Sequence, residues 1–163
     1  MGTRSPVTLP DLAALSPAPR LALIVSRFNE TVTGGLRDGA VAWLAEHNIA
    51  IADEDILAAP GAFEMPLLAQ ALAKSGRYEG VICLGCVVKG DTAHFEFISL
   101  GTTVGIMQAS LATEVHIAFG VLTNYKEEQA QDRSSDDVHN QGSDAAEACV
   151  ECRAWAARCR RGR

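Results

Sequence analysis

The stretch GVICLGCVV at residues 80–88 is apolar at nearly every position and decides the fold class. A strand that is apolar on both faces must be covered on both faces, as in the parallel sheets of α/β proteins. A second run of this kind, RLALIVS, occupies residues 20–26, and shorter candidate strands lie at 54–58 and 117–123. The intervals between the strands carry the apolar spacing of helices. The expected helices span 31–47, 66–75, 95–113, 126–133 and 143–158.

The alternation of strands and helices predicts an α/β fold, a three-layer αβα sandwich with a doubly wound four-stranded parallel sheet of flavodoxin type. The length of 163 residues fits one domain, which we expect at residues 20–158. Before it lies a proline-rich N-terminal segment, 1–19, which is either flexible or packed against a neighbour, and after it a basic tail, 159–163. In such a sheet the ligand crevice lies beyond the carboxyl ends of the strands.

The charge of the chain is uneven and argues against some partners. Five of the 14 basic residues follow position 152, so the preceding part holds nine basic against 20 acidic residues. A body this acidic repels a phosphate backbone, and we expect no nucleic-acid partner. No apolar run approaches the roughly 18 residues that span a bilayer, and the N-terminus lacks the apolar core of a signal peptide. We therefore expect a cytoplasmic protein with no membrane partner.

Five cysteines include two CxxC pairs, Cys83/Cys86 and Cys149/Cys152, a spacing that can bind zinc. On a strand, however, a spacing of three places the first two thiols on opposite faces of the sheet. The second pair, with Cys159, lies in an alanine-rich helical pattern where cysteine acts as a small apolar residue. We expect neither a metal site nor disulfides.

The residues that follow the expected strands carry the candidate chemistry. Phe28 and Phe63 are either core residues or a platform that stacks a flat heterocycle. The run 90–92 (Gly-Asp-Thr) is either a helix cap or a phosphate cradle of free N–H groups and a hydroxyl. His94 follows it directly and titrates near neutrality, which suits a proton shuttle.

Six blocks follow one another in the chain and together carry a family resemblance. They are RFN at 27–29, PGAFEMP at 60–66, GCVVKGDTAHFEF at 85–97, FGVLT at 119–123, EQAQDR at 128–133 and NQGSDAAEA at 140–148. In this order the blocks resemble the 6,7-dimethyl-8-ribityllumazine synthase family over about residues 20–155.

The resemblance implies a condensation of 5-amino-6-(D-ribitylamino)uracil with 3,4-dihydroxy-2-butanone 4-phosphate, a step of riboflavin biosynthesis. It implies no metal and no organic cofactor. His94 would move protons and Arg133 would clamp the phosphate, so these two are the catalytic candidates. The expected substrate-binding residues are Phe28, Asn29, Gly61, Ala62, Phe63, Glu64, Val87, Val88, Lys89, Gly90, Asp91, Thr92, Phe119 and Gln141.

Two further implications concern the assembly and a departure from the family pattern. In this family Phe119 comes from a neighbouring subunit, so we expect a homo-oligomer, a pentamer or a multiple of pentamers, with active sites at subunit interfaces. Gln141 stands where the family usually has lysine, which removes a cation from the rim of the site. His139 or Lys126 could compensate.

Two other functions remain open at this point. One is a non-catalytic paralogue that binds ribityl pyrimidines or flavins, or only builds a shell. The other is the related archaeal-type riboflavin synthase, which shares the fold. The intact PGAFE and GDTAHFE blocks favour the lumazine enzyme over the latter.

Overall fold

The structure is a computed structural model that describes residues 17–161. Four parallel strands form one sheet in the order β2-β1-β3-β4. The strands are β1 (Leu21–Ser26), β2 (Ile56–Ala59), β3 (Gly80–Val88) and β4 (His116–Asn124). The helices are α1 (Glu30–Glu46), α2 (Met65–Lys74), α3 (His94–Thr113), α4 (Glu127–Gln131) and α5 (Gln141–Arg161). The expectation for the N-terminal segment falls mostly outside the described residues.

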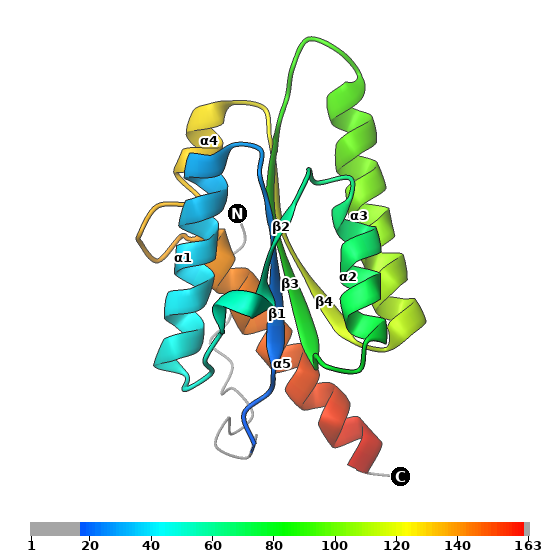
Figure 1. The fold of residues 1–163 in the computed structure, drawn as a ribbon. Coiled ribbons are helices and arrows are strands. Elements are labelled where there is room, and N and C mark those ends of the chain that lie inside the picture. The colour runs from blue at the N-terminus through cyan, green and yellow to red at the C-terminus, as the bar shows by residue number, and fades with distance from the viewer. Residues whose placement is uncertain (1–16, 162–163) are drawn as a thin grey trace.

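Helices cover both faces of the sheet, as the apolar strands require. Helices α1, α4 and α5 lie on one side and α2 and α3 on the other (Figure 1). The core is correspondingly divided in two: Cys86 packs in the cluster with α1 and α5, and Cys83 in the cluster with α2 and α3. The expected αβα sandwich is therefore confirmed, as is the placement of these two thiols on opposite faces. Among residues 17–161, none of the five cysteines forms a disulfide.

The second strand differs from its expected range of 54–58. It begins at Ile56, and the preceding residues form a short 3-10 helix, Asp53–Asp55. Asp55 is buried before the strand because Arg20 donates hydrogen bonds to both of its carboxylate oxygens, at 3.1 and 2.7 Å. The hydroxyl of Tyr78 donates a further bond of 2.8 Å to the same carboxylate. These partners lie far away in sequence, so local apolar spacing could not reveal them.

Two arginines near the end of α5 form contacts at the amino end of the sheet. Arg153 forms an ion pair with Glu79, directly before β3. Arg160 donates a 3.0 Å hydrogen bond to the carbonyl of Glu114, directly before β4. These arginines therefore have partners within the chain. Among the described residues, no helix is both long and apolar enough to span a membrane.

Candidate active site

The loop after β1 carries an exposed aromatic side chain. Asn29 adopts a left-handed conformation (φ 56°), which asparagine tolerates better than most residues, and the chain turns there into α1. Its side-chain amide donates a 3.0 Å hydrogen bond to the carbonyl of Cys86 near the end of β3. The turn leaves 66% of Phe28 exposed at the carboxyl end of the sheet.

The loop after β2 places a glycine and a carboxylate beside Phe28. A Cβ added at Gly61 would lie 3.5 Å from the ring of Phe28 and 3.0 Å from a carboxylate oxygen of Glu64. Ala62 is buried beneath them, whereas Phe63 is 57% exposed and has its ring edge against Gly101 of α3. Neither phenylalanine belongs to the core, so both aromatic faces remain available to a ligand.

The loop after β3 is held by a few contacts and otherwise open. The backbone N–H of Lys89 donates a 2.9 Å bond to the carbonyl of Asn124, and its ammonium pairs with Glu96 at 3.2 Å. The Thr92 hydroxyl accepts a long 3.4 Å bond from the N–H of His94. Val87 and Val88 are half-buried, whereas residues 89–93 of this loop and His94 at the start of α3 are all exposed.

A cleft of about 360 Å³ lies beyond β4 and contains Arg133 and Gln141. One guanidinium nitrogen of Arg133 donates a 2.7 Å bond to the carbonyl of Gln129. Its other N–H groups have no partner among residues 17–161. The backbone N–H of Gln141 donates a 2.8 Å bond to the carbonyl of Arg133, so the structure brings these two expected site residues together.

Asn140 holds the segment that contains Arg133 and Gln141 in place. It was assigned no role from sequence. Its side-chain oxygen accepts bonds from the N–H groups of Gly142 (2.8 Å) and Ser143 (3.3 Å), the contacts of a helix N-cap. Its amide nitrogen donates to the carbonyls of Gly35 (3.0 Å) and Ser135 (2.9 Å). Helix α5 therefore begins at Gln141, not at 143 as expected. An asparagine immediately before a helix is a capping signal that the sequence did offer.

Gly142 lets the start of α5 approach α1. A Cβ at this position would overlap the carbonyl oxygen of Leu36. The Asn-x-Gly part of the motif therefore has a structural function: it docks the segment that carries Arg133 and Gln141 against α1.

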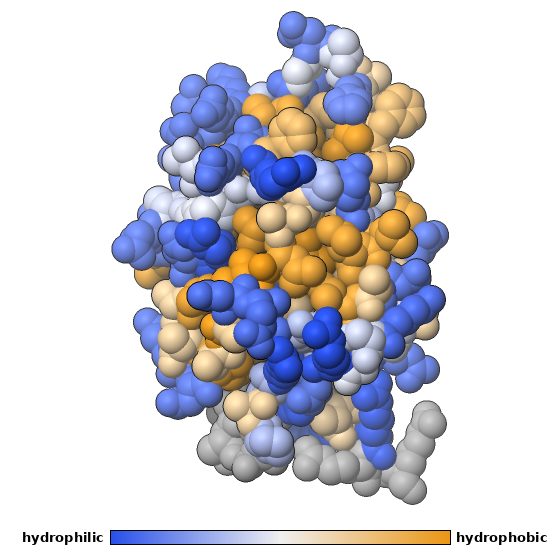
Figure 2. Space-filling view, in the orientation of Figure 1, coloured by the Kyte–Doolittle hydropathy of each residue, from blue (hydrophilic) through white to orange (hydrophobic). Residues whose placement is uncertain are grey.

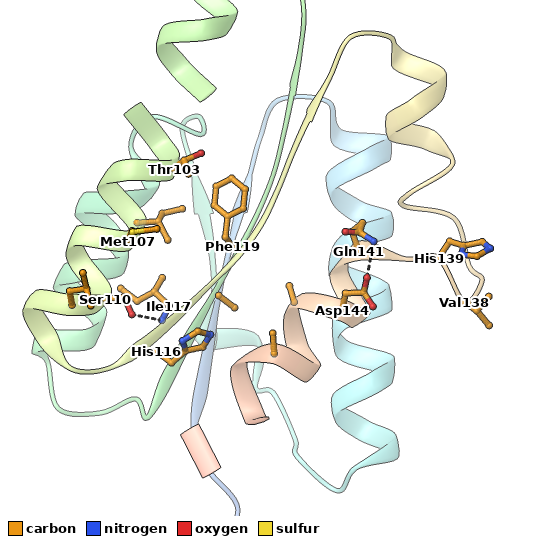
Figure 3. A pocket seen from close by; sticks show the side chains of 15 residues that line it. Thr103, Met107, Ser110, His116, Ile117, Phe119, Val138, His139, Gln141 and Asp144 are labelled. Carbon is orange, nitrogen blue, oxygen red and sulfur yellow. Dashed lines mark hydrogen bonds between the residues drawn. The ribbon is translucent and has the colours of Figure 1, made fainter. Parts of the chain in front are cut away.

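A larger groove of about 870 Å³ runs along the free edge of β4, between α3 and α5. Figure 3 shows Phe119 pointing into it between Met107 on α3 and the Gln141 side of the groove. Phe119 is 42% exposed. His139 lines this groove, whereas Lys126 lines neither this groove nor the cleft of Arg133.

The structure does not bring Phe119 to Phe28 within one chain. Phe119 is in register with Cys83 of β3, which is in register with Ile24 of β1. Phe28 follows the end of β1, two strands away from β4. The expected site residues therefore form two groups: those around Phe28 and the loop after β3, and those that line the cavities beside β4, namely Phe119, Arg133 and Gln141.

Burial controls the ionisation of two groups near these cavities. It raises the pKa of Cys86, beneath Asn29, to about 11, so the thiol stays protonated near neutrality. It lowers the pKa of His116, which lines the β4-edge groove. In the part of the chain that the structure describes, no three histidine, cysteine or acidic side chains converge as metal ligands would.

An open parallel sheet with loops of this kind at its carboxyl ends defines an α/β ligand-binding protein of flavodoxin type. The family model described as 6,7-dimethyl-8-ribityllumazine synthase matches residues 18–156. A protein of Caulobacter vibrioides called 6,7-dimethyl-8-ribityllumazine synthase 1 is 58% identical over 132 residues, which are 81% of this chain and 86% of that protein. A protein of Salinibacter ruber called 6,7-dimethyl-8-ribityllumazine synthase is 45% identical over 132 residues, 81% of this chain and 85% of its own length. The chain belongs to the 6,7-dimethyl-8-ribityllumazine synthase family.

Proposed function

We propose that this protein condenses 5-amino-6-(D-ribitylamino)uracil with 3,4-dihydroxy-2-butanone 4-phosphate to form 6,7-dimethyl-8-ribityllumazine. The reaction forms an imine at the 5-amino group, eliminates phosphate and closes the second ring, with water released. One observation carries the proposal: the match to the family model extends over residues 18–156, nearly the whole of the described chain.

The roles of individual residues follow from where they lie. Phe28 offers an exposed face on which the pyrimidine stacks, and the adjacent Glu64 accepts hydrogen bonds from the polar edge or the ribityl chain. Arg133 has free N–H groups that suit a phosphate ester, since a guanidinium binds phosphate through parallel hydrogen bonds. The exposed loop with Gly90, Asp91 and Thr92 supplies further donors, and His94 at its end moves protons. Holding two substrates in register can supply roughly 7–11 kcal/mol of the barrier reduction.

The active form that we propose is a homo-oligomer of at least five chains, in which Phe119 of one copy closes the site at Phe28 and His94 of the next. The two-strand separation of these residues within a chain supports a shared site. Exposed apolar side chains also follow one another along α3 at helical spacing, and a contiguous exposed apolar patch is typical of an interaction surface. They are Phe97, Leu100, Val104, Met107 and Leu111.

The opposite edge of the sheet supports assembly as well. Apolar residues gather over the middle of the molecule in the view of Figure 2, where Figure 1 places β2 and α2. Val25, Ile56, Leu57 and Ala58 line a groove of about 310 Å³ there. We further propose that the protein acts in the cytoplasm, a compartment in which cysteines that form no disulfide remain reduced.

The test of the reaction is to mix both substrates with the protein and follow lumazine fluorescence. We expect a rate well above the uncatalysed background, and a loss of about 100-fold in His94→Ala because a general acid–base is removed. A folded preparation with no rate above background would refute the reaction and leave the non-catalytic paralogue. The relatives named above, which carry the name of the synthase, do not favour that alternative.

A further inference from the structure

Gln141 occupies the junction between the two main cavities of the site. Of the residues that line the cleft of Arg133 and the β4-edge groove, Gln141 alone belongs to both. It is half-buried and is the first residue of α5. A ligand that reaches from Arg133 toward Phe119 must therefore pass this side chain.

The Gln141 carboxamide is held by a neighbouring carboxylate. Its nitrogen donates a 2.7 Å hydrogen bond to Asp144, one turn along α5, and Figure 3 shows this contact at the wall of the groove. Such a short bond to a charged acceptor is stronger than a bond between neutral groups. The carboxamide oxygen has no partner within the described residues, so it remains an acceptor for a ligand.

The two cavities that meet at Gln141 differ in charge, because Arg133 lines the cleft and Asp144 lines the groove. Asp144 lines the β4-edge groove and also the neighbouring cavity, which contains Asp136 and Asp137. The backbones of Gln141 and Arg133 share the hydrogen bond described above. A phosphate that is bound in the cleft of Arg133 and extends past Gln141 would meet the Asp144 carboxylate, and like charges repel over several ångströms at a protein surface.

We infer that Asp144 is a positioning residue that sets the specificity of the junction. Asp144 holds the nitrogen of the Gln141 carboxamide, so that the neutral carboxamide oxygen can accept a hydrogen bond from a substrate hydroxyl. If a lysine replaced Gln141, the carboxylate of Asp144 would pair with its ammonium and reduce its attraction for phosphate. Arg133 is then the principal cation for phosphate. This inference deepens the proposed function and rests on it for the identity of the substrates.

The test is a double-mutant cycle with inorganic phosphate as the probe and its Kd measured by calorimetry. Gln141→Lys alone should tighten phosphate binding less than about twofold, because the introduced ammonium pairs with Asp144 three residues away. Asp144→Asn alone, which keeps an oxygen acceptor for Gln141, should tighten it about twofold by removing the charge. The two substitutions together should tighten it about tenfold, more than the product of the single effects.

A matched control removes the same charge at the other end of the sheet. Asp53 is exposed before β2, and Asp53→Asn should leave the phosphate Kd unchanged. Asp144→Ala removes both charge and acceptor, so in turnover assays it should raise the KM of a hydroxyl-bearing substrate, and Asp144→Asn should restore it. A purely structural role for Asp144 would lower the melting temperature without coupling to position 141.

The outcomes separate this inference from the proposed reaction, since phosphate binding needs no turnover. The role of Asp144 would be overturned if the effects of the two substitutions on the phosphate Kd were additive. It would also be overturned if Gln141→Lys alone tightened phosphate binding about tenfold. Failure of every variant to bind phosphate would overturn it as well. If the cycle shows coupling but no lumazine forms, the role of Asp144 stands and the reaction is wrong.

Discussion

The polar groups at the two ends of the sheet differ in whether they have hydrogen-bond partners. At the amino end, Arg20 and Tyr78 satisfy the buried Asp55, and Arg153 pairs with Glu79. At the carboxyl end, Arg133 keeps most of its donors unpaired. The exposed side chains there include Phe28, Phe63 and His94. The charged groups at the amino end thus have partners within residues 17–161, whereas donors and side chains at the carboxyl end remain accessible to a ligand or another copy.

This difference teaches where stability and function reside. A buried carboxylate with three hydrogen bonds stabilises the fold only while all its partners are present. Exposed groups without partners contribute little to folding, so the site can be changed at little cost in stability. Substitutions at the two ends should therefore separate activity from stability.

The largest effect is expected at the carboxyl end. Arg133→Ala should lower kcat/KM for lumazine formation by about 100- to 1,000-fold, because a charged donor to phosphate is lost. Arg133→Lys should recover only part of this, since an ammonium lacks the paired donor geometry. Thermal unfolding should change little in both variants. A large fall in melting temperature with normal activity in the folded fraction would contradict the contrast between the ends.

At the amino end the expected effect is on folding. Asp55→Asn should lower the free energy of unfolding at neutral pH by about 2 kcal/mol, because charge-assisted hydrogen bonds are weakened. Urea unfolding measures this, and kcat/KM of the folded enzyme should stay within about twofold, a small change on the scale of single substitutions.

The same carboxylate gives the amino end a pH dependence. The hydrogen bonds from Arg20 hold the pKa of Asp55 below its usual range. The contribution of Asp55 is therefore complete above its unfolded pKa of about 3.9 and is lost as the pH falls through the lower folded value. Urea unfolding between neutral and acidic pH should be less pH-dependent in Asp55→Asn. Equal slopes in both proteins would show that Asp55 is not the group that titrates.

Substitution of Asn140, unlike the substitutions above, should affect both stability and substrate binding. Asn140→Ala removes the N-cap of α5 and should cost about 1 kcal/mol of stability. It should also raise the KM of the phosphate ester, because Arg133 and Gln141 lose their fixed relation. Asn140→Ser, which retains a capping oxygen but not the amide donors to Gly35 and Ser135, should recover stability better than KM. Identical recovery of both would argue that Asn140 acts on folding alone.

A moderate effect on substrate binding is expected on the β4 edge. If Phe119 closes a neighbour's site as we propose, Phe119→Ala should raise substrate KM about tenfold, the loss of one stacking or packing contact. Mixing Phe119→Ala with His94→Ala chains should restore part of the activity at shared sites. No complementation in mixed assemblies would place both residues in the site of a single chain.

Much of this architecture could be predicted from local pattern, and the failures have a common cause. The range of β3 agrees at both ends, because its apolar run is long and needs no distant partner. Asp55 was misplaced into a strand because its partners lie 35 and 23 residues away. Phe28, Gly61 and Glu64 were expected at one edge because parallel strands end together. The Gln141–Asp144 contact depends on side-chain rotamers that a motif does not encode.

The uncovered edges of β2 and β4 also bear on how the protein unfolds. No described residue pairs with the outer side of either strand. When copies cover these edges, the free energy of assembly adds to the stability of every chain, and the unfolding midpoint rises with protein concentration. On dilution the same strands become open templates for wrong pairing, so the separated chain is the aggregation-prone species.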